Sequence, residues 1–275
     1  MTLRNTIFIC LALSLVTLHI QAAKTEIPQA VIDLYEAHTI EDMGYRLLRP
    51  VNFNPKVKYP VVITLHNGPA MSDVGSKSYN VKNLRFMNVQ FADPARRLEY
   101  PAFILCPQTS SPFSKKHLGL CKQIIAALPS VDMGRIYVMG QSMGGFGTYT
   151  FISADPSYFA AAIACSGLPS KVEDLSALKN FNLWAMHGAE DTTVSYDKHS
   201  AFFEEMKKIK GRMKFTTFIK IGHSTEALMM GNYSMADTPQ PSGSLKNGQT
   251  TQSAGPGFDP EPNTLKWLFS KRSGK

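Results

Sequence analysis

Cysteine is scarce in this 275-residue chain, which contains four. Cys10 lies in an N-terminal apolar run, and an odd number remains beyond it: Cys106, Cys121 and Cys165. Three cysteines form at most one internal pair, so the sequence excludes a fold held together by a disulfide framework. Pairing of Cys106 with Cys121 stays open, because spacing alone does not establish it. No CxxC pair or His/Cys cluster has the spacing of a zinc site, and we expect no metal.

Long runs of one charge are also absent, although the formal net charge is +8. Lysine and arginine are scattered, and no basic run is interleaved with aromatic side chains, as a nucleic-acid site would require. We therefore expect a solvated basic surface and no nucleic-acid partner.

The N-terminal apolar run covers residues 7–18 and is too short for a comfortable membrane span, which needs about 20 residues. Arg4 precedes the run, and the small residues Ala22 and Ala23 follow it. This order is that of a secretory signal peptide, with a retained anchor as the alternative. We predict a signal over residues 1–23, no membrane span after its removal, and a secreted or periplasmic protein.

The rest of the chain, 24–275, has the composition of one globular domain. Short apolar, β-prone runs alternate with segments of helical periodicity, which favours an α/β fold with a mostly parallel sheet covered on both faces. Residues 24–42 are mixed and partly helical, and residues 231–262, rich in Gly, Pro, Ser and Asn, are predicted to be a mobile loop. The predicted strands are 45–50, 61–66, 102–107, 135–140, 160–167, 182–188 and 214–222, and the predicted helices are 113–128, 145–154, 196–211 and 261–272.

One serine stands between glycines where a strand is predicted to end and a helix to begin. The stretch Gly140-Gln141-Ser142-Met143-Gly144 fits G-x-S-x-G in the strand–turn–helix context that a nucleophile elbow requires. Small flanking residues let the helix pack against the strand, while the serine projects from the end of the sheet. The alternative is a glycine turn without chemistry.

A serine hydroxyl needs a general base, and the elbow fold places acid and base later in the chain. His223 follows the strand predicted at 214–222 and lies downstream of any candidate acid, whereas His66 and His187 end earlier strands. His117 and His199 fall on predicted helices, where exposed or capping histidines are ordinary. We predict His223 as the base.

The acid is predicted from the segment that follows the strand at 182–188. Asp191 opens a turn there before a helix, although aspartate at such a position also acts as a helix cap. Glu190 is interpreted as a solvated neighbour, and Asp197, at the start of the helix, is the weaker alternative.

Acyl transfer also needs donors for the developing oxyanion. The backbone N–H of Met143 is one predicted donor, and the other is the N–H of Asn67 or Gly68, in the loop after the strand at 61–66. For Gly68 the alternative is a turn residue only. His66, Gln141 and Gln108 are predicted to line the substrate site.

With these residues placed, the chain resembles the α/β-hydrolase superfamily, and more closely secreted bacterial esterases of the polyhydroxybutyrate-depolymerase, feruloyl-esterase and "predicted peptidase" type. The resemblance runs from about residue 45 to 222 and returns at "LKWLFSKR". Its marks are "YRLLRP…YPVVITLH", "FADPARRLEYPAFILCPQ", "VDMGRIYVMGQSMGGFGTY", "FAAAIACSG" and "MHGAEDTTV".

The resemblance implies an α/β-hydrolase fold in which Ser142 is the nucleophile, Asp191 the acid and His223 the base. It further implies that His187 and Gly188 shape the turn carrying the acid, and that residues 107–108 line the cleft entrance. Asn67 departs from the family pattern, because glycine is common at its position.

These observations predict a secreted serine esterase that works through a Ser-His-Asp triad and an acyl-enzyme, without a cofactor. The substrate class is a small-molecule or carbohydrate-linked ester, with acylated carbohydrates and polyesters as candidates. A serine peptidase of the same fold is the first alternative, and a non-catalytic surface-binding module is the second. The sequence does not indicate which oligomeric state the protein has.

Overall fold

The computed structural model describes residues 27–73, 81–169, 174–230, 248–256 and 259–274. The predicted signal peptide, 1–23, lies outside them, as do 231–247 and 257–258 of the predicted loop. Within the described ranges, no helix is long and apolar enough to cross a membrane.

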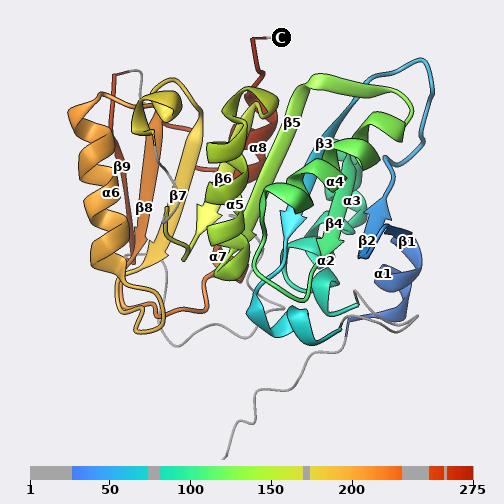
Figure 1. Ribbon diagram of the computed structural model, residues 1–275, viewed down its shortest axis with the longest axis horizontal. Helices are drawn as coiled ribbons and strands as arrows, with labels where there is room; N and C mark the ends of the chain where they lie inside the picture. The colour runs from blue at the N-terminus through green and yellow to red at the C-terminus, as the bar shows by residue number, and fades with distance from the viewer. Residues whose placement is uncertain (1–26, 74–80, 170–173, 231–247, 257–258, 275) are drawn as a thin grey trace, which may run out of the picture.

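A central sheet organises the described part of the chain, with strand order β1-β2-β4-β3-β5-β6-β7-β8-β9 (Figure 1). Strands β3 to β8 run parallel, whereas β1, β2 and β9 pair antiparallel at the two edges. The strands are β1 Glu36–Ile40, β2 Met43–Leu48, β3 Tyr59–Leu65, β4 Phe103–Gln108, β5 Val131–Gln141, β6 Ala161–Cys165, β7 Leu183–Gly188, β8 Met213–Phe218 and β9 Gln249–Ser253.

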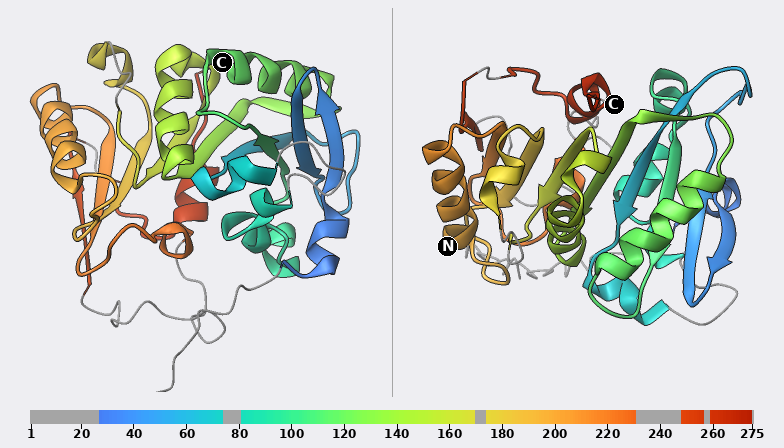
Figure 2. Two further views of the ribbon diagram at one scale, coloured as in Figure 1. Left: turned by 60° about the horizontal axis from the view of Figure 1, so that its bottom comes forward. Right: turned by 45° about the horizontal axis from the view of Figure 1, so that its top comes forward.

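Helices cover both faces of the sheet. The α-helices are α1 Gln29–Leu34, α2 Met87–Phe91, α3 Pro94–Glu99, α4 Lys115–Ala127, α5 Met143–Ala154, α6 Tyr196–Lys208, α7 Glu226–Met229 and α8 Thr264–Ser270. Helices α4, α5 and α6 pack on one face, and α2, α7 and α8 pack on the other (Figure 2). Successive side chains of a strand point to opposite faces, so Val61 and Ile63 enter one core while Val62 enters the other. Burial on both faces explains why the inner strands are apolar throughout.

The predicted α/β fold with a mostly parallel sheet is confirmed, and each predicted strand and helix overlaps an observed one. The structure differs from the prediction in two places: the strand predicted at 214–222 ends at Phe218, and residues 249–253 of the predicted loop form β9. The segment 24–42 is partly helical as predicted, through α1, and also contains β1. The edge strand β9 reads QTTQS and has no apolar alternation, so only its backbone pairing with β8 reveals it.

The three cysteines of the described chain are buried and free. Cys106 packs in the core on one face of the sheet and Cys121 in the core on the other, so the pairing left open by the sequence does not form. Burial raises the pKa of the Cys106 and Cys165 thiols to about 12, which keeps them protonated at neutral pH.

Candidate active site

Ser142 occupies a sharp turn between β5 and α5. Its backbone has φ 55° and ψ −120°, a strained conformation for a residue with a side chain. The Ser142 N–H donates to the Cys165 carbonyl at 2.9 Å, and its own carbonyl accepts the Phe146 N–H at 2.9 Å. These two bonds tie the turn to the end of β6 and to the first turn of α5.

The glycines around Ser142 are required by close backbone contacts. A Cβ added to Gly144 would lie 2.0 Å from the Leu65 carbonyl oxygen, and one added to Gly145 would lie 2.5 Å from the Cys165 carbonyl oxygen. A Cβ on Gly140 would meet the Gly144 backbone at 2.5 Å. The start of α5 therefore packs directly on the ends of β3 and β6, which leaves the serine as the projecting side chain of the turn.

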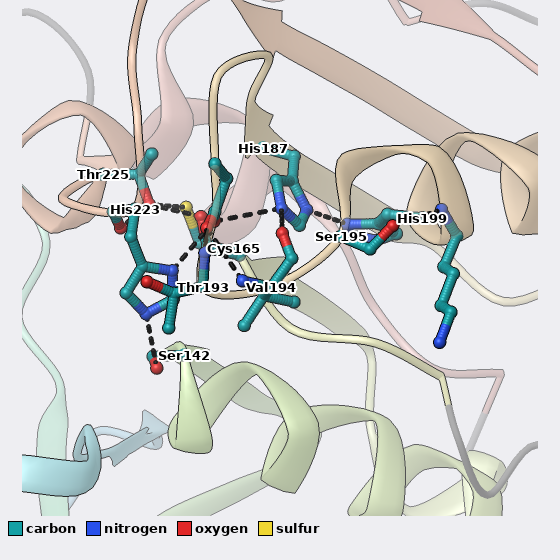
Figure 3. Close-up of polar contacts among 12 residues, drawn as sticks. Ser142, Cys165, His187, Thr193, Val194, Ser195, His199, His223 and Thr225 are labelled. Atoms are coloured by element: carbon teal, nitrogen blue, oxygen red, sulfur yellow. Dashed lines mark hydrogen bonds and ion pairs between the residues drawn. The ribbon is translucent and has the colours of Figure 1, made fainter.

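Ser142, His223 and Asp191 form a continuous line of contacts (Figure 3 labels Ser142 and His223). The Ser142 Oγ lies 2.7 Å from His223 Nε2, and His223 Nδ1 lies 2.8 Å from Asp191 Oδ2. The three residues follow β5, β8 and β7, whose carboxyl ends meet at one edge of the sheet. The sequence prediction named these three residues, and the structure brings them together.

The Asp191 carboxylate is buried and accepts hydrogen bonds on both oxygens. Oδ1 accepts the backbone N–H groups of Thr193 at 2.9 Å and Val194 at 2.8 Å, while Oδ2 faces the rings of His223 and His187. Burial alone would raise the pKa of this carboxyl, but the donors outweigh burial and hold its pKa below the ordinary value. Asp191 is not the helix cap considered as the alternative, because Ser195 caps α6; Asp191 accepts the N–H groups of its own turn and contacts His223.

Two residues hold the loop that carries His223. The His223 carbonyl accepts the side-chain amide of Gln141 at 2.8 Å and the N–H of Thr225 at 3.0 Å. The Thr225 hydroxyl in turn contacts Ser166 Oγ at 2.8 Å and Cys165 Sγ at 3.1 Å at the end of β6. Thr225 had no sequence signal, because its partners lie about 60 residues earlier.

Gln141 was predicted to line the substrate site, and its amide nitrogen donates to the His223 carbonyl, which supports the His223 loop. Beside it lies a cavity of about 20 Å³, which is shared with Asn67 and Glu226. A volume of this size holds about one water molecule rather than a substrate group. Gln141 Oε1 is buried without a hydrogen-bond partner in the described part of the chain, and its place in the substrate site stays a prediction.

The predicted oxyanion side is formed by the start of α5 and by the loop after β3. Met143 is the first residue of α5, and Gly68 opens the 3-10 helix η1 (Gly68–Asp73). A Cβ on Gly68 would meet nothing within 4 Å, so no packing contact requires glycine there. Asn67 donates its side-chain amide to Glu226 Oε1 at 2.8 Å, which anchors this loop to α7.

The buried side chains of His66 and Gln108 form hydrogen bonds with the backbone of the loop after β3. The His66 ring faces the Asn67 carbonyl at 2.8 Å and accepts the Thr109 N–H at 3.1 Å, so backbone groups occupy both ring nitrogens. Burial lowers the pKa of His66 to about 4, which leaves the ring neutral. Gln108 is buried and donates to the Ala70 carbonyl. Both His66 ring nitrogens are therefore engaged, whereas Gln108 Oε1 is buried without a hydrogen-bond partner in the described part of the chain. That these two residues line the substrate site stays a prediction.

Glu226 is a buried carboxylate of this region that the sequence reasoning missed. Burial raises its pKa, and the Asn67 amide offsets this only in part. Because the carboxyl loses its proton more easily in the unfolded chain, stability falls as pH rises through the unfolded pKa toward the folded one.

We therefore expect Glu226→Gln, which keeps an acceptor for Asn67, to raise Tm at pH 8 but not at pH 4. Each kcal/mol recovered corresponds to about 2–4 °C. Calorimetry at both pH values measures the effect, with the exposed Glu190→Gln as the matched control. An equal gain at both pH values would contradict the account.

A cavity of about 490 Å³ opens beside the segment that carries Asp191. Phe146, one turn after Ser142, and Leu168 give it apolar walls, and the segment after Asp191 gives it hydroxyl-bearing walls. The hydroxyl-bearing residues are Thr192, Thr193, Ser195 and Tyr196. The cavity combines an aromatic surface with hydrogen-bonding groups in the segment that begins at Asp191.

The sheet topology and the placement of this site after parallel strands are those of the α/β-hydrolase fold. More particularly, residues 111–233 match the model of the Dienelactone hydrolase family, and the match contains Ser142, Asp191 and His223.

Two solved structures share the fold. A thermostable esterase has a TM-score of 0.63 and 25% identity over 88% of this chain and 64% of its own. A putative dipeptidyl aminopeptidase IV from Bacteroides ovatus has a TM-score of 0.55 and 17% identity, over 71% of this chain and 34% of its own. A curated relative, the probable dipeptidyl-aminopeptidase B of Aspergillus oryzae, is 32% identical over 137 residues, which are 45% of this chain. The chain spans only 15% of that relative's length.

Proposed function

We propose that this protein hydrolyses carboxylic esters through an acyl-enzyme on Ser142. The observation that carries the proposal is the line of contacts at 2.7 Å and 2.8 Å from Ser142 through His223 to Asp191. Nucleophile, base and orienting acid each need the next within hydrogen-bond reach, and this line meets that requirement.

In this mechanism Asp191 accepts a hydrogen bond from the Nδ1–H of His223, which leaves the lone pair of Nε2 facing the serine. His223 takes the Ser142 proton as Oγ attacks the ester carbonyl. The N–H of Met143, with that of Asn67 or Gly68, stabilises the oxyanion. His223 then protonates the leaving alcohol, and water activated by the same ring releases the acid. These steps need no cofactor.

An ester substrate is favoured over a peptide by the comparison with the thermostable esterase, which covers 88% of this chain. The hydroxyl-bearing wall of the 490 Å³ cavity suits a small or carbohydrate-linked leaving group. The second candidate is a peptidase, because the Aspergillus oryzae relative is named an aminopeptidase. A non-catalytic module is disfavoured, because it has no need for an aligned serine, histidine and aspartate. The N-terminal pattern of Arg4, an apolar run and Ala22-Ala23 supports a secreted or periplasmic location.

The bond type is tested by a pair of substrates that differ in one atom, p-nitrophenyl acetate and p-nitroacetanilide. We expect the purified protein to hydrolyse the ester at least about a thousandfold faster, because an amine is the poorer leaving group. Comparable rates on the two would favour the peptidase. A panel of acetyl, butyryl and feruloyl esters, with acetylated sugars, then defines the acyl and alcohol groups.

A further inference from the structure

The line of contacts through the site does not stop at Asp191. Behind the carboxylate it continues through three side chains buried beneath the site (Figure 3 shows the two histidines). His187 Nε2 lies 3.1 Å from Asp191 Oδ2, and His187 Nδ1 lies 2.7 Å from His199 Nδ1. His199 Nε2 then lies 2.7 Å from the Tyr149 hydroxyl. The three residues come from β7, α6 and α5.

The contact between the two histidines raises a question of proton placement. Two Nδ1 atoms 2.7 Å apart share one proton, so one ring donates and the other accepts. His187 Nε2 faces only acceptors, the Asp191 carboxylate at 3.1 Å and the Val194 carbonyl at 3.0 Å. It must therefore carry a proton, and in a neutral ring His187 Nδ1 is then the acceptor.

The neighbours of the two rings favour this neutral form. Burial lowers the pKa of His187, although Val194 and Asp191 oppose the shift, and burial lowers the pKa of His199 well below its ordinary value. His199 is fully buried and its ring centroid lies 5.1 Å from that of Phe215, an apolar contact that does not solvate a charge.

The remaining protons follow from this assignment. His199 Nδ1 donates to His187 Nδ1. His199 Nε2 therefore carries a lone pair and accepts a hydrogen bond from the Tyr149 hydroxyl. The His187 Nε2–H is shared between the Val194 carbonyl at 3.0 Å and Asp191 Oδ2 at 3.1 Å, while His223 Nδ1 donates to Asp191 Oδ2 from the other side. Every donor in the chain from Tyr149 points toward the Asp191 carboxylate.

We propose that His187, His199 and Tyr149 are positioning residues that hold Asp191 ionised and directed at His223 through this one-way chain of hydrogen bonds. The inference rests on the proposed function, since it assigns a role to Asp191 in that mechanism. With two backbone donors on Oδ1 and two rings on Oδ2, the carboxylate is held against rotation. Loss of the distal donors leaves the His187 ring held only through Nε2, where the Val194 carbonyl at 3.0 Å competes with Asp191 Oδ2 at 3.1 Å for its proton, and the contact with Oδ2 weakens.

Three variants test this chain of hydrogen bonds, with ester hydrolysis as the readout. Tyr149→Phe removes only the terminal hydroxyl, and kcat should fall about fivefold, the worth of one neutral hydrogen bond. His199→Phe removes both ring nitrogens, and kcat should fall about 20-fold or more. His199→Asn places an amide nitrogen near the position of Nδ1 and should recover kcat to within about fivefold of wild type, although it leaves a cavity. KM should not change in any of them.

A matched control separates positioning from general loss of stability. Tyr137→Phe deletes another buried tyrosine hydroxyl, which donates to the Lys271 carbonyl at 2.8 Å on the other face of the sheet. Its kcat should equal that of wild type even where its Tm falls as far as that of Tyr149→Phe. If kcat follows Tm across all four variants, the three residues are merely structural and the proposal fails.

Nitrogen-15 NMR of histidine-labelled protein tests the proton assignment directly. We expect His187 as the Nε2–H tautomer and His199 as the Nδ1–H tautomer, with the His199 pattern lost in Tyr149→Phe. The opposite tautomers in wild type would overturn the proposal. Ser142→Ala distinguishes failure of the proposed function from failure of the positioning chain. If this variant stays active, the proposed function fails. If it is inactive while Tyr149→Phe and His199→Phe keep wild-type kcat, only the positioning chain fails.

Discussion

Ser142→Ala is expected to lower kcat/KM for p-nitrophenyl acetate by about three to six orders of magnitude. The variant loses the only oxygen that lies 2.7 Å from His223 Nε2 in the described chain, and no covalent intermediate then forms. Residual activity should come from the oxyanion donors and from binding. Initial rates measured against the spontaneous hydrolysis of the ester quantify the loss.

Ser224→Ala is the matched control for this change. Ser224 is exposed and lies directly after His223, so its removal tests the loop without touching the line of contacts. It should hydrolyse the ester at the wild-type rate. Wild-type activity in Ser142→Ala, at equal folded fraction by circular dichroism, would show that the chemistry lies elsewhere.

Asp191→Asn is expected to lower kcat by about 10⁴-fold while leaving KM nearly unchanged. Each carboxylate oxygen accepts from two donors: backbone N–H groups on Oδ1 and histidine rings on Oδ2. An amide NH₂ in either orientation therefore faces two donors. The His223 ring must turn or exchange its tautomer, and its Nε2 no longer accepts the Ser142 proton.

The exposed neighbour Glu190 supplies the control for Asp191. Glu190→Gln removes a carboxylate one residue away, outside the line of contacts, and should retain wild-type kcat. The two variants are compared by steady-state kinetics with thermal melting alongside. A loss in Glu190→Gln as large as that in Asp191→Asn would mean that the local charge, rather than the Asp191 geometry, supports the reaction.

Much of the fold and the three central residues of the site could be predicted from sequence. The parallel strands are buried on both faces, so their apolar runs are visible without structure. The elbow was predictable because close packing of α5 on β3 and β6 demands glycine, and Ser142 stands among those glycines. Asp191 and His223 followed from their places after strands at one edge of the sheet.

The supporting contacts could not be predicted, because they join elements that only packing brings together. His199 was interpreted as an ordinary helix histidine, whereas it is fully buried and contacts Tyr149 from another helix. Gln141 stands in the G-x-S-x-G motif, yet its partner is a carbonyl 82 residues away. The strand β9 consists of polar side chains, so no hydrophobic pattern indicates it.

Covalent labelling with a fluorophosphonate tests the central claim most directly. The reagent should add once to the folded wild-type protein, and peptide mass spectrometry should place the adduct on Ser142, with loss of ester hydrolysis in proportion. Asp191→Asn should react far more slowly, and heat-unfolded protein not at all. An active protein that takes up no label, or that carries it on a residue other than Ser142, would contradict the account.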